Sequence, residues 1–126
     1  MPAYDFAHVR AVDVVTGDAV TVGVVLSCRQ ARFLGVRVLD GATAARALGL
    51  DATLLRRSLD AFLEVAEGTP DAGPVGRLPP SERFHFLTAT RSTSLQTSPV
   101  HTGLEDDPER ALDRLEAAVL GRRQTS

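Results

Sequence analysis

The fold of this chain is decided by its residues 4–39, which read YDFAHVRAVDVVTGDAVTVGVVLSCRQARFLGVRVL. Three runs in this stretch are rich in the β-branched and aromatic residues that favour strands, and they cover residues 4–15, 20–28 and 32–39. Gly17 supplies the positive φ that a tight hairpin turn requires, and residues 29–31 form a second short connection. Because short connections join neighbouring antiparallel strands, the stretch predicts a three-stranded antiparallel meander.

The length of each turn sets which residues face each other across the strands. A two-residue turn at residues 17–18 places Val9 opposite Leu26, and a three-residue second turn places Val36 beside Val24. On this register one face of the sheet is apolar, and it contains Val22, Val24, Leu26, Val36 and Val38. The opposite face carries polar and small residues, which are His8, Arg10, Gly23, Ser27, Gly35 and Arg37.

Two helices are expected after the meander. Residues 41–49 suit a short helix that ends at Gly49, and Asp51 is a suitable N-cap for a longer helix that extends to about Glu67. In the longer helix apolar residues repeat at helical spacing, at Leu55, Leu59, Phe62 and Ala66. We expect this helix to cover the apolar face of the sheet.

The second half of the chain predicts a loop, an extended segment and a last helix. The loop is expected over residues 68–80, which hold three glycines and four prolines. Pro99 disfavours helix at the residue before it, so residues 92–98 are expected to be extended. The last helix has Pro108 in its first turn and is expected to end at Gly121.

These elements predict an α+β fold. A three-stranded antiparallel meander is extended by a later strand, and helices pack on one face of the sheet. The 126 residues suit a single domain, expected over residues 1–121 and followed by a polar C-terminal tail at residues 122–126.

The composition is that of a globular protein, with 44% hydrophobic and 24% charged residues. No apolar run approaches the ~20 residues of a membrane span, and the first residues lack the basic and apolar parts of a signal peptide. The single cysteine, Cys28, fits a reducing cytosol, and the absence of lysine, isoleucine and asparagine fits a GC-rich genome. We therefore expect a cytoplasmic bacterial protein without membrane contact. A net charge of −2 and a pI of 5.9 argue against a nucleic-acid partner.

No template for catalysis, a metal or a cofactor is found in the sequence. It lacks the G-x-S-x-G elbow of serine hydrolases, and the phosphate-binding G-x-x-x-x-G-K loop requires a lysine that the chain does not contain. The three histidines form neither an H-x-H nor an H-E-x-x-H pair, and the acidic residues 105–107 precede a helix that they can cap. We expect no catalytic residues, no metal and no cofactor, and the sequence favours a protein without enzymatic activity.

The most unusual segment is TATRSTSLQTSPVHT, residues 88–102, in which eight of 15 residues are serine or threonine. Its hydroxyls, amide, imidazole and guanidinium can together bind a phosphate, a carboxylate or a polar peptide. The candidate binding residues are Arg83, His85, Arg91, Ser92, Thr93, Gln96, Thr97, Ser98, His101 and Thr102. The alternative is a partly exposed strand whose hydroxyls bond to the local backbone.

Arg91 is the expected main anion contact of this segment. A fully extended chain would separate Arg91 from His101 by ~33 Å. A shared site therefore needs a reversal of the chain near Pro99, or another basic group that tertiary packing brings to His101. If Arg83, His85, Arg91 and His101 surround one concave pocket, a ligand site is favoured, and a scattered arrangement favours an interaction module.

Several segments resemble a known family. They are YDFAHVR near the start, VTVGVVLSC, RFLGVRV, and above all RFHFLTATRSTSLQTSPVHTGLEDDP. Together they resemble the bacterial family of domain of unknown function 3037, from about residue 4 to residue 120. The resemblance implies a small cytosolic domain that is often encoded beside a HipA-like serine/threonine kinase, with no catalytic residues to carry over.

Two functions are therefore expected as alternatives. The first is a non-enzymatic interaction or regulatory module with a protein partner, for which the HipA-like kinase is the candidate. The second is a small enzyme or a binder of a phosphate- or carboxylate-bearing ligand that uses residues 91–102. The sequence leaves the oligomeric state open.

Overall fold

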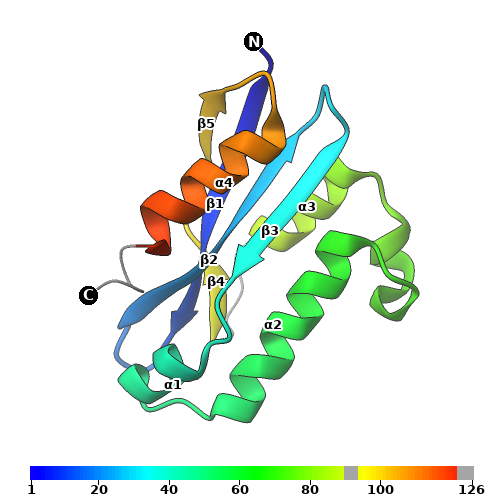
Figure 1. The fold of residues 1–126 in the computed structure, drawn as a ribbon. Coiled ribbons are helices and arrows are strands. Elements are labelled where there is room, and N and C mark those ends of the chain that lie inside the picture. Colours follow the sequence, from blue (N-terminus) through cyan, green and yellow to red (C-terminus); the bar gives the residue numbers. More distant parts are fainter. Residues whose placement is uncertain (90–93, 122–126) are drawn as a thin grey trace.

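The computed structural model describes residues 1–89 and 94–121, which form one sheet flanked by helices (Figure 1). The elements in chain order are β1 (Ala3–Val12), β2 (Ala19–Cys28), β3 (Phe33–Val38), α1 (Ala42–Leu48), α2 (Ala52–Glu67), the 3-10 segment η1 (Pro70–Arg77), α3 (Pro80–Thr88), β4 (Leu95–Thr97), β5 (His101–Leu104) and α4 (Pro108–Val119). No helix in these two ranges is long and apolar enough to cross a membrane.

The sheet confirms the predicted α+β class and the antiparallel meander. Its strands run in the order β3-β2-β1, and β4 and β5 both pair with the outer edge of β1. All four pairings are antiparallel. The later strand expected to extend the meander is therefore present, and it is divided into two short strands that follow one another along β1.

The predicted register of the first hairpin is wrong. Phe6 faces Leu26 where Val9 was expected, which is a difference of three residues. The cause is a longer loop than the expected two-residue turn. The N–H of Asp13 donates to the carbonyl of Asp18 at 2.8 Å, and the Asp13 carboxylate accepts from the N–H of Val15 at 2.9 Å. This Asx-type turn ends β1 at Val12.

The two faces of the sheet also differ from the prediction. The register between β1 and β2 shifts after Val9, because Gly23 is paired with Val9 and Thr21 with Arg10, so Val22 is an extra residue in β2. In the second hairpin Val36 pairs with Val25, one residue away from the expected Val24. A slip of one residue reverses the face of every side chain. The expected single apolar face is therefore wrong: Val22, Val36 and Val38 belong to one core, whereas Val24 and Leu26 belong to another.

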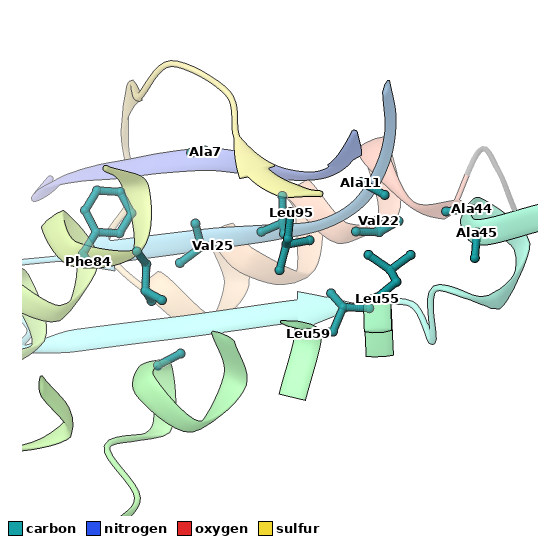
Figure 2. Packing of buried hydrophobic residues seen from close by; sticks show 13 residues of the cluster. Ala7, Ala11, Val22, Val25, Ala44, Ala45, Leu55, Leu59, Phe84 and Leu95 are labelled. Atoms are coloured by element: carbon teal, nitrogen blue, oxygen red, sulfur yellow. The ribbon is translucent and has the colours of Figure 1, made fainter. Parts of the chain in front are cut away.

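The first core lies between the sheet and α1, α2 and α3 (Figure 2). As expected, α2 contributes the buried side chains of Leu55 and Leu59, and Phe62 packs at the margin. The strands contribute the fully buried Ala7, Val9 and Ala11. The Asp51 carboxylate caps α2 by accepting from the N–H groups of Thr53 and Leu54, which confirms its predicted role.

The second core lies on the opposite face, where α4 packs against β2 and β3. Helices thus cover both faces, which differs from the expected placement of all helices on one face. The reason is that β2 carries large apolar residues on both sides, so both faces of the sheet must be buried by helices. Gly35 allows the close approach of α4, since a Cβ there would lie 2.6 Å from Cδ2 of Leu112.

The segment expected to be a loop, residues 68–80, contains a 3-10 segment at Pro70–Arg77 and the start of α3. Proline sets a φ that suits the first turn of a helix, and this explains why Pro70 and Pro80 each begin one. The two turns of η1 meet at Gly73, whose φ of 69° is left-handed. The tail predicted at residues 122–126 lies outside the described residues.

A mutation in α4 tests whether a second hydrophobic core covers this face of the sheet. Leu112 on α4 is fully buried, so Leu112→Ala should lower the free energy of unfolding by about 2–5 kcal/mol through lost burial and a cavity. Leu104→Ala is the control, because Leu104 is 60% exposed and its truncation should change stability by less than about 0.5 kcal/mol. Urea unfolding of both variants measures this, and equal stabilities would contradict the second core.

Candidate functional site

Arg83, one of the predicted binding residues, contacts the C-terminal end of α2. Its Nη1 donates to the carbonyl of Ala66 at 2.7 Å and to that of Val65 at 3.2 Å. Its Nε donates to the carbonyl of Leu78 at 3.0 Å. The guanidinium satisfies the Ala66 carbonyl at the end of α2, shares the Val65 carbonyl with the N–H of Gly68, and offsets the helix dipole. Arg83 therefore joins α2 to the segment that precedes α3.

The structure separates the other predicted cationic residues. His85 is exposed on α3, which packs on the first core, and its ring lies 6.4 Å from that of Phe84. His101 is exposed in β5, and its ring lies 5.4 Å from that of Phe6 at the margin of the second core. Arg91, Ser92 and Thr93 lie outside the described residues, so the role predicted for Arg91 stays a prediction.

The hydroxyls of the polar segment bond within the chain. Thr102 donates to the Asp5 carboxylate at 2.9 Å, and Thr97 donates to the carbonyl of Thr88 at 3.4 Å. Ser98 is buried between β4 and β5, where its N–H donates to the carbonyl of His8 and its Oγ accepts from the N–H of His8, both at 2.9 Å. Ser98 therefore keeps the edge of β1 paired across the break between the two short strands.

The chain does not reverse at Pro99. Thr97 pairs with Val9 and His101 pairs with Phe6, so residues 95–104 run along β1 in one direction. A basic group from another part of the chain lies near His101 instead, which is the second arrangement that the sequence left open. That group is His8, whose ring lies 6.5 Å from the ring of His101.

We call this group of side chains the His8–Arg10–His101 cluster, and it includes the ring of Phe6. Phe6, His8 and Arg10 alternate along β1 and so point to one side of the sheet. The Phe6 ring lies 6.2 Å from the His8 ring. The period of two places His8 and Arg10 on one face, as the sequence predicts, but only the pairing of β5 brings His101 to His8.

The Arg10 guanidinium brings a positive charge to the two imidazoles of this cluster. Burial, the neighbouring His101 and the Arg10 guanidinium, in that order, lower the pKa of His8 below its ordinary value of 6.5. The Nε of Arg10 is buried without a hydrogen-bond partner among the described residues. Within residues 1–89 and 94–121 no carboxylate forms an ion pair with His8, Arg10 or His101.

A second feature is an apolar cleft of about 360 Å³ between α2, α3 and β4. Most of its lining is hydrophobic, from Ala61, Phe62, Val65, Phe86, Leu87 and Leu95. Gln96 and Thr97 are the predicted binding residues that line it. The cleft and the His8–Arg10–His101 cluster lie on opposite faces of the sheet, since α2 and α3 belong to the first core and Phe6 to the second.

A protein metal centre needs several ligand side chains that lie close together. In residues 1–89 and 94–121 no three histidine, cysteine, aspartate or glutamate side chains gather as ligands. Cys28 is buried in the second core, where it packs as a small apolar residue.

The chain belongs to the family described as "Protein of unknown function (DUF3037)", which it matches over residues 6–120. The match confirms the resemblance that the sequence suggested. No curated protein and no solved structure matches the chain significantly.

The contacts of Arg83 predict a structural effect. Arg83→Ala should lower the free energy of unfolding by about 1–3 kcal/mol, because three carbonyls lose a charged donor. Arg57→Ala is the matched control, since Arg57 is exposed on α2 and its loss should change stability by less than about 0.5 kcal/mol. Thermal and urea unfolding of the two variants decide this, and a stable Arg83→Ala protein would remove the capping role.

The lowered pKa of His8 predicts a loss of stability in acid. The unfolded chain takes up a proton at His8 near pH 6.5, whereas the folded chain does so only at lower pH. The free energy of unfolding should therefore fall as the pH decreases through this value. Urea unfolding of wild type and His8→Gln at about pH 7.5 and pH 5.5 should show a smaller fall in the variant. Identical falls would contradict the shifted pKa.

Proposed function

We propose that this chain is a non-enzymatic interaction module of a cytoplasmic bacterial system, and that it docks a protein partner through the apolar cleft between α2, α3 and β4. The observation that carries the proposal is the cleft itself, an opening of about 360 Å³ lined mostly by hydrophobic side chains. Phe86 at the cleft is 39% exposed and so contributes aromatic surface to it.

The polar groups of the cleft favour an apolar occupant. The Ser58 hydroxyl donates to the carbonyl of Leu54 at 3.2 Å, and the Thr97 hydroxyl donates to that of Thr88. Sites for small polar ligands fix them with several convergent polar groups, but these two hydroxyls have already donated their hydrogens. The occupant proposed is therefore one large apolar side chain of a protein partner, the usual anchor of a protein interface.

The first partner to test is a HipA-like serine/threonine kinase, because the family resemblance implies this genomic neighbour. An accessory domain that binds such a kinase needs a surface of its own and no catalytic residues. The lack of catalytic sequence templates and the apolar cleft both fit that role.

Ala61→Arg tests the docking surface. Ala61 is exposed on α2 at the cleft, so arginine there should obstruct the cleft and leave the helix intact. We expect at least a tenfold loss of affinity for the HipA-like kinase of the same genome by calorimetry, about 1.4 kcal/mol, with an unchanged melting temperature.

Ala117→Arg is the matched control, since Ala117 is an exposed alanine on α4, which covers the other face of the sheet. It should bind the kinase like wild type. Equal affinity of wild type and Ala61→Arg would reject the cleft as the docking surface, and a wild-type chain that does not bind the kinase would reject that partner.

A further inference from the structure

We infer that His8, Arg10 and His101 form a binding site for a phosphate monoester, distinct from the apolar cleft. The two imidazoles come from β1 and β5 and lie beside the ring of Phe6. Arg10 follows His8 by two residues on the same side of β1. A phosphate monoester carries a charge of about −1.5 to −2 near neutral pH and has three acceptor oxygens. It therefore matches three cationic donors better than a carboxylate does.

Arg10 carries a donor that the fold leaves unsatisfied. Its Nε is buried and has no hydrogen-bond partner within residues 1–89 and 94–121. A buried donor of a charged group without a partner is costly, which makes such a group a candidate for a missing ligand. The guanidinium is a planar fork that can hold two phosphate oxygens at once.

Acidic side chains of α4 and of the segment before it already have basic partners. On α4, which packs on the same face, Glu109, Asp113 and Glu116 all pair with Arg37. Arg114 binds Glu105 at 2.8 Å, and this hydrogen bond holds the pKa of that carboxyl below its usual value.

The pairing strands bring no opposite charge to the cluster either. Across β2, Val24 faces His8 and Thr21 faces Arg10, and both side chains are uncharged. Across β4 the neutral Gln96 faces Arg10. The described groups that act electrostatically on His8 are His101 and Arg10, and both disfavour its protonated form. A bound anion would therefore be stabilised by the Arg10 guanidinium and would favour the protonated form of His8.

The cluster is partly open to solvent. His101 is exposed, and His8 and Arg10 are half-buried, so a ligand can reach the exposed parts of these side chains while the strand holds them in place. The backbone of His8 is fixed by its two hydrogen bonds to Ser98. Preorganised donors lose less side-chain entropy when they bind.

Binding should also depend on pH in a defined direction. An anion favours the protonated form of a neighbouring imidazole, so binding is coupled to proton uptake by His8. Affinity should therefore rise as the pH falls from about 7.5 to about 6. The pH dependence is therefore assigned to His8.

The inference is tested by titrating the full chain with inorganic phosphate, with O-phosphoserine, and with a phosphoserine peptide and its unphosphorylated form. Acetate is the carboxylate control. Calorimetry gives the affinity, and the NMR signals of the Arg10 Nε–H and the histidine rings report the site. Wild type should bind phosphoserine about tenfold more tightly at pH 6 than at pH 7.5, and more tightly than acetate. Tighter binding of the phosphopeptide than of O-phosphoserine would identify the natural ligand as a phosphorylated protein. Equal binding would identify it as a small phosphate monoester.

Three variants decide the outcome. Arg10→Gln should reduce phosphoserine binding by at least about tenfold, and His101→Gln provides a second test at an exposed position where the fold is not at risk. Arg57→Gln is the control and should bind like wild type. Unchanged binding in both Arg10→Gln and His101→Gln, or no binding by wild type, would overturn the site. Ala61→Arg should retain phosphoserine binding, so failure of the cleft and failure of this site are distinguishable.

Discussion

Backbone hydrogen bonding on both edges of β1 is the interaction on which the rest of the structure depends. One edge pairs with β2, and the other pairs with β4 and β5 in turn. Segments about 90 residues apart in sequence are joined in this way, and the two bonds between His8 and Ser98 keep the edge paired where the strands break. A central strand satisfies its backbone groups on both sides, and its alternation then decides which side chains enter each layer.

That alternation produces two unlike surfaces from one strand. Ala7, Val9 and Ala11 are completely buried beneath the helices of the first core, whereas Phe6, His8 and Arg10 point to the other side. Because α4 packs chiefly on β2 and β3, the middle of β1 is only partly covered on that side. The apolar cleft and the His8–Arg10–His101 cluster are consequently separated by the thickness of the sheet. The proposed protein partner and the proposed phosphate ligand would therefore not compete.

The arginines of this chain have different structural roles, which their residue type alone does not predict. Arg83 donates to three carbonyls, Arg37 pairs with three carboxylates of α4, and Arg114 joins Glu105 to the hydroxyl of Tyr4. Arg10 differs, since its buried Nε has no partner in the part of the chain that the structure describes. From the sequence, Arg83 was the better candidate for a ligand contact because it precedes the polar segment. The distinction depends on which acceptors the fold places beside each guanidinium, and this is a property of long-range packing.

The sequence by itself determined the α+β class, the three strands of the meander, the cap of α2 at Asp51 and the capped start of α4, because these features depend on propensity and on neighbours a few residues away. It also placed His8 and Arg10 on one side of a strand. Only the tertiary structure decided the register, since the Asp13 turn and the extra residue at Val22 shift the pairing by amounts that turn composition does not reveal. Only the tertiary structure joined His101 to His8, because the contact between them requires β5 to pair with β1 across most of the chain.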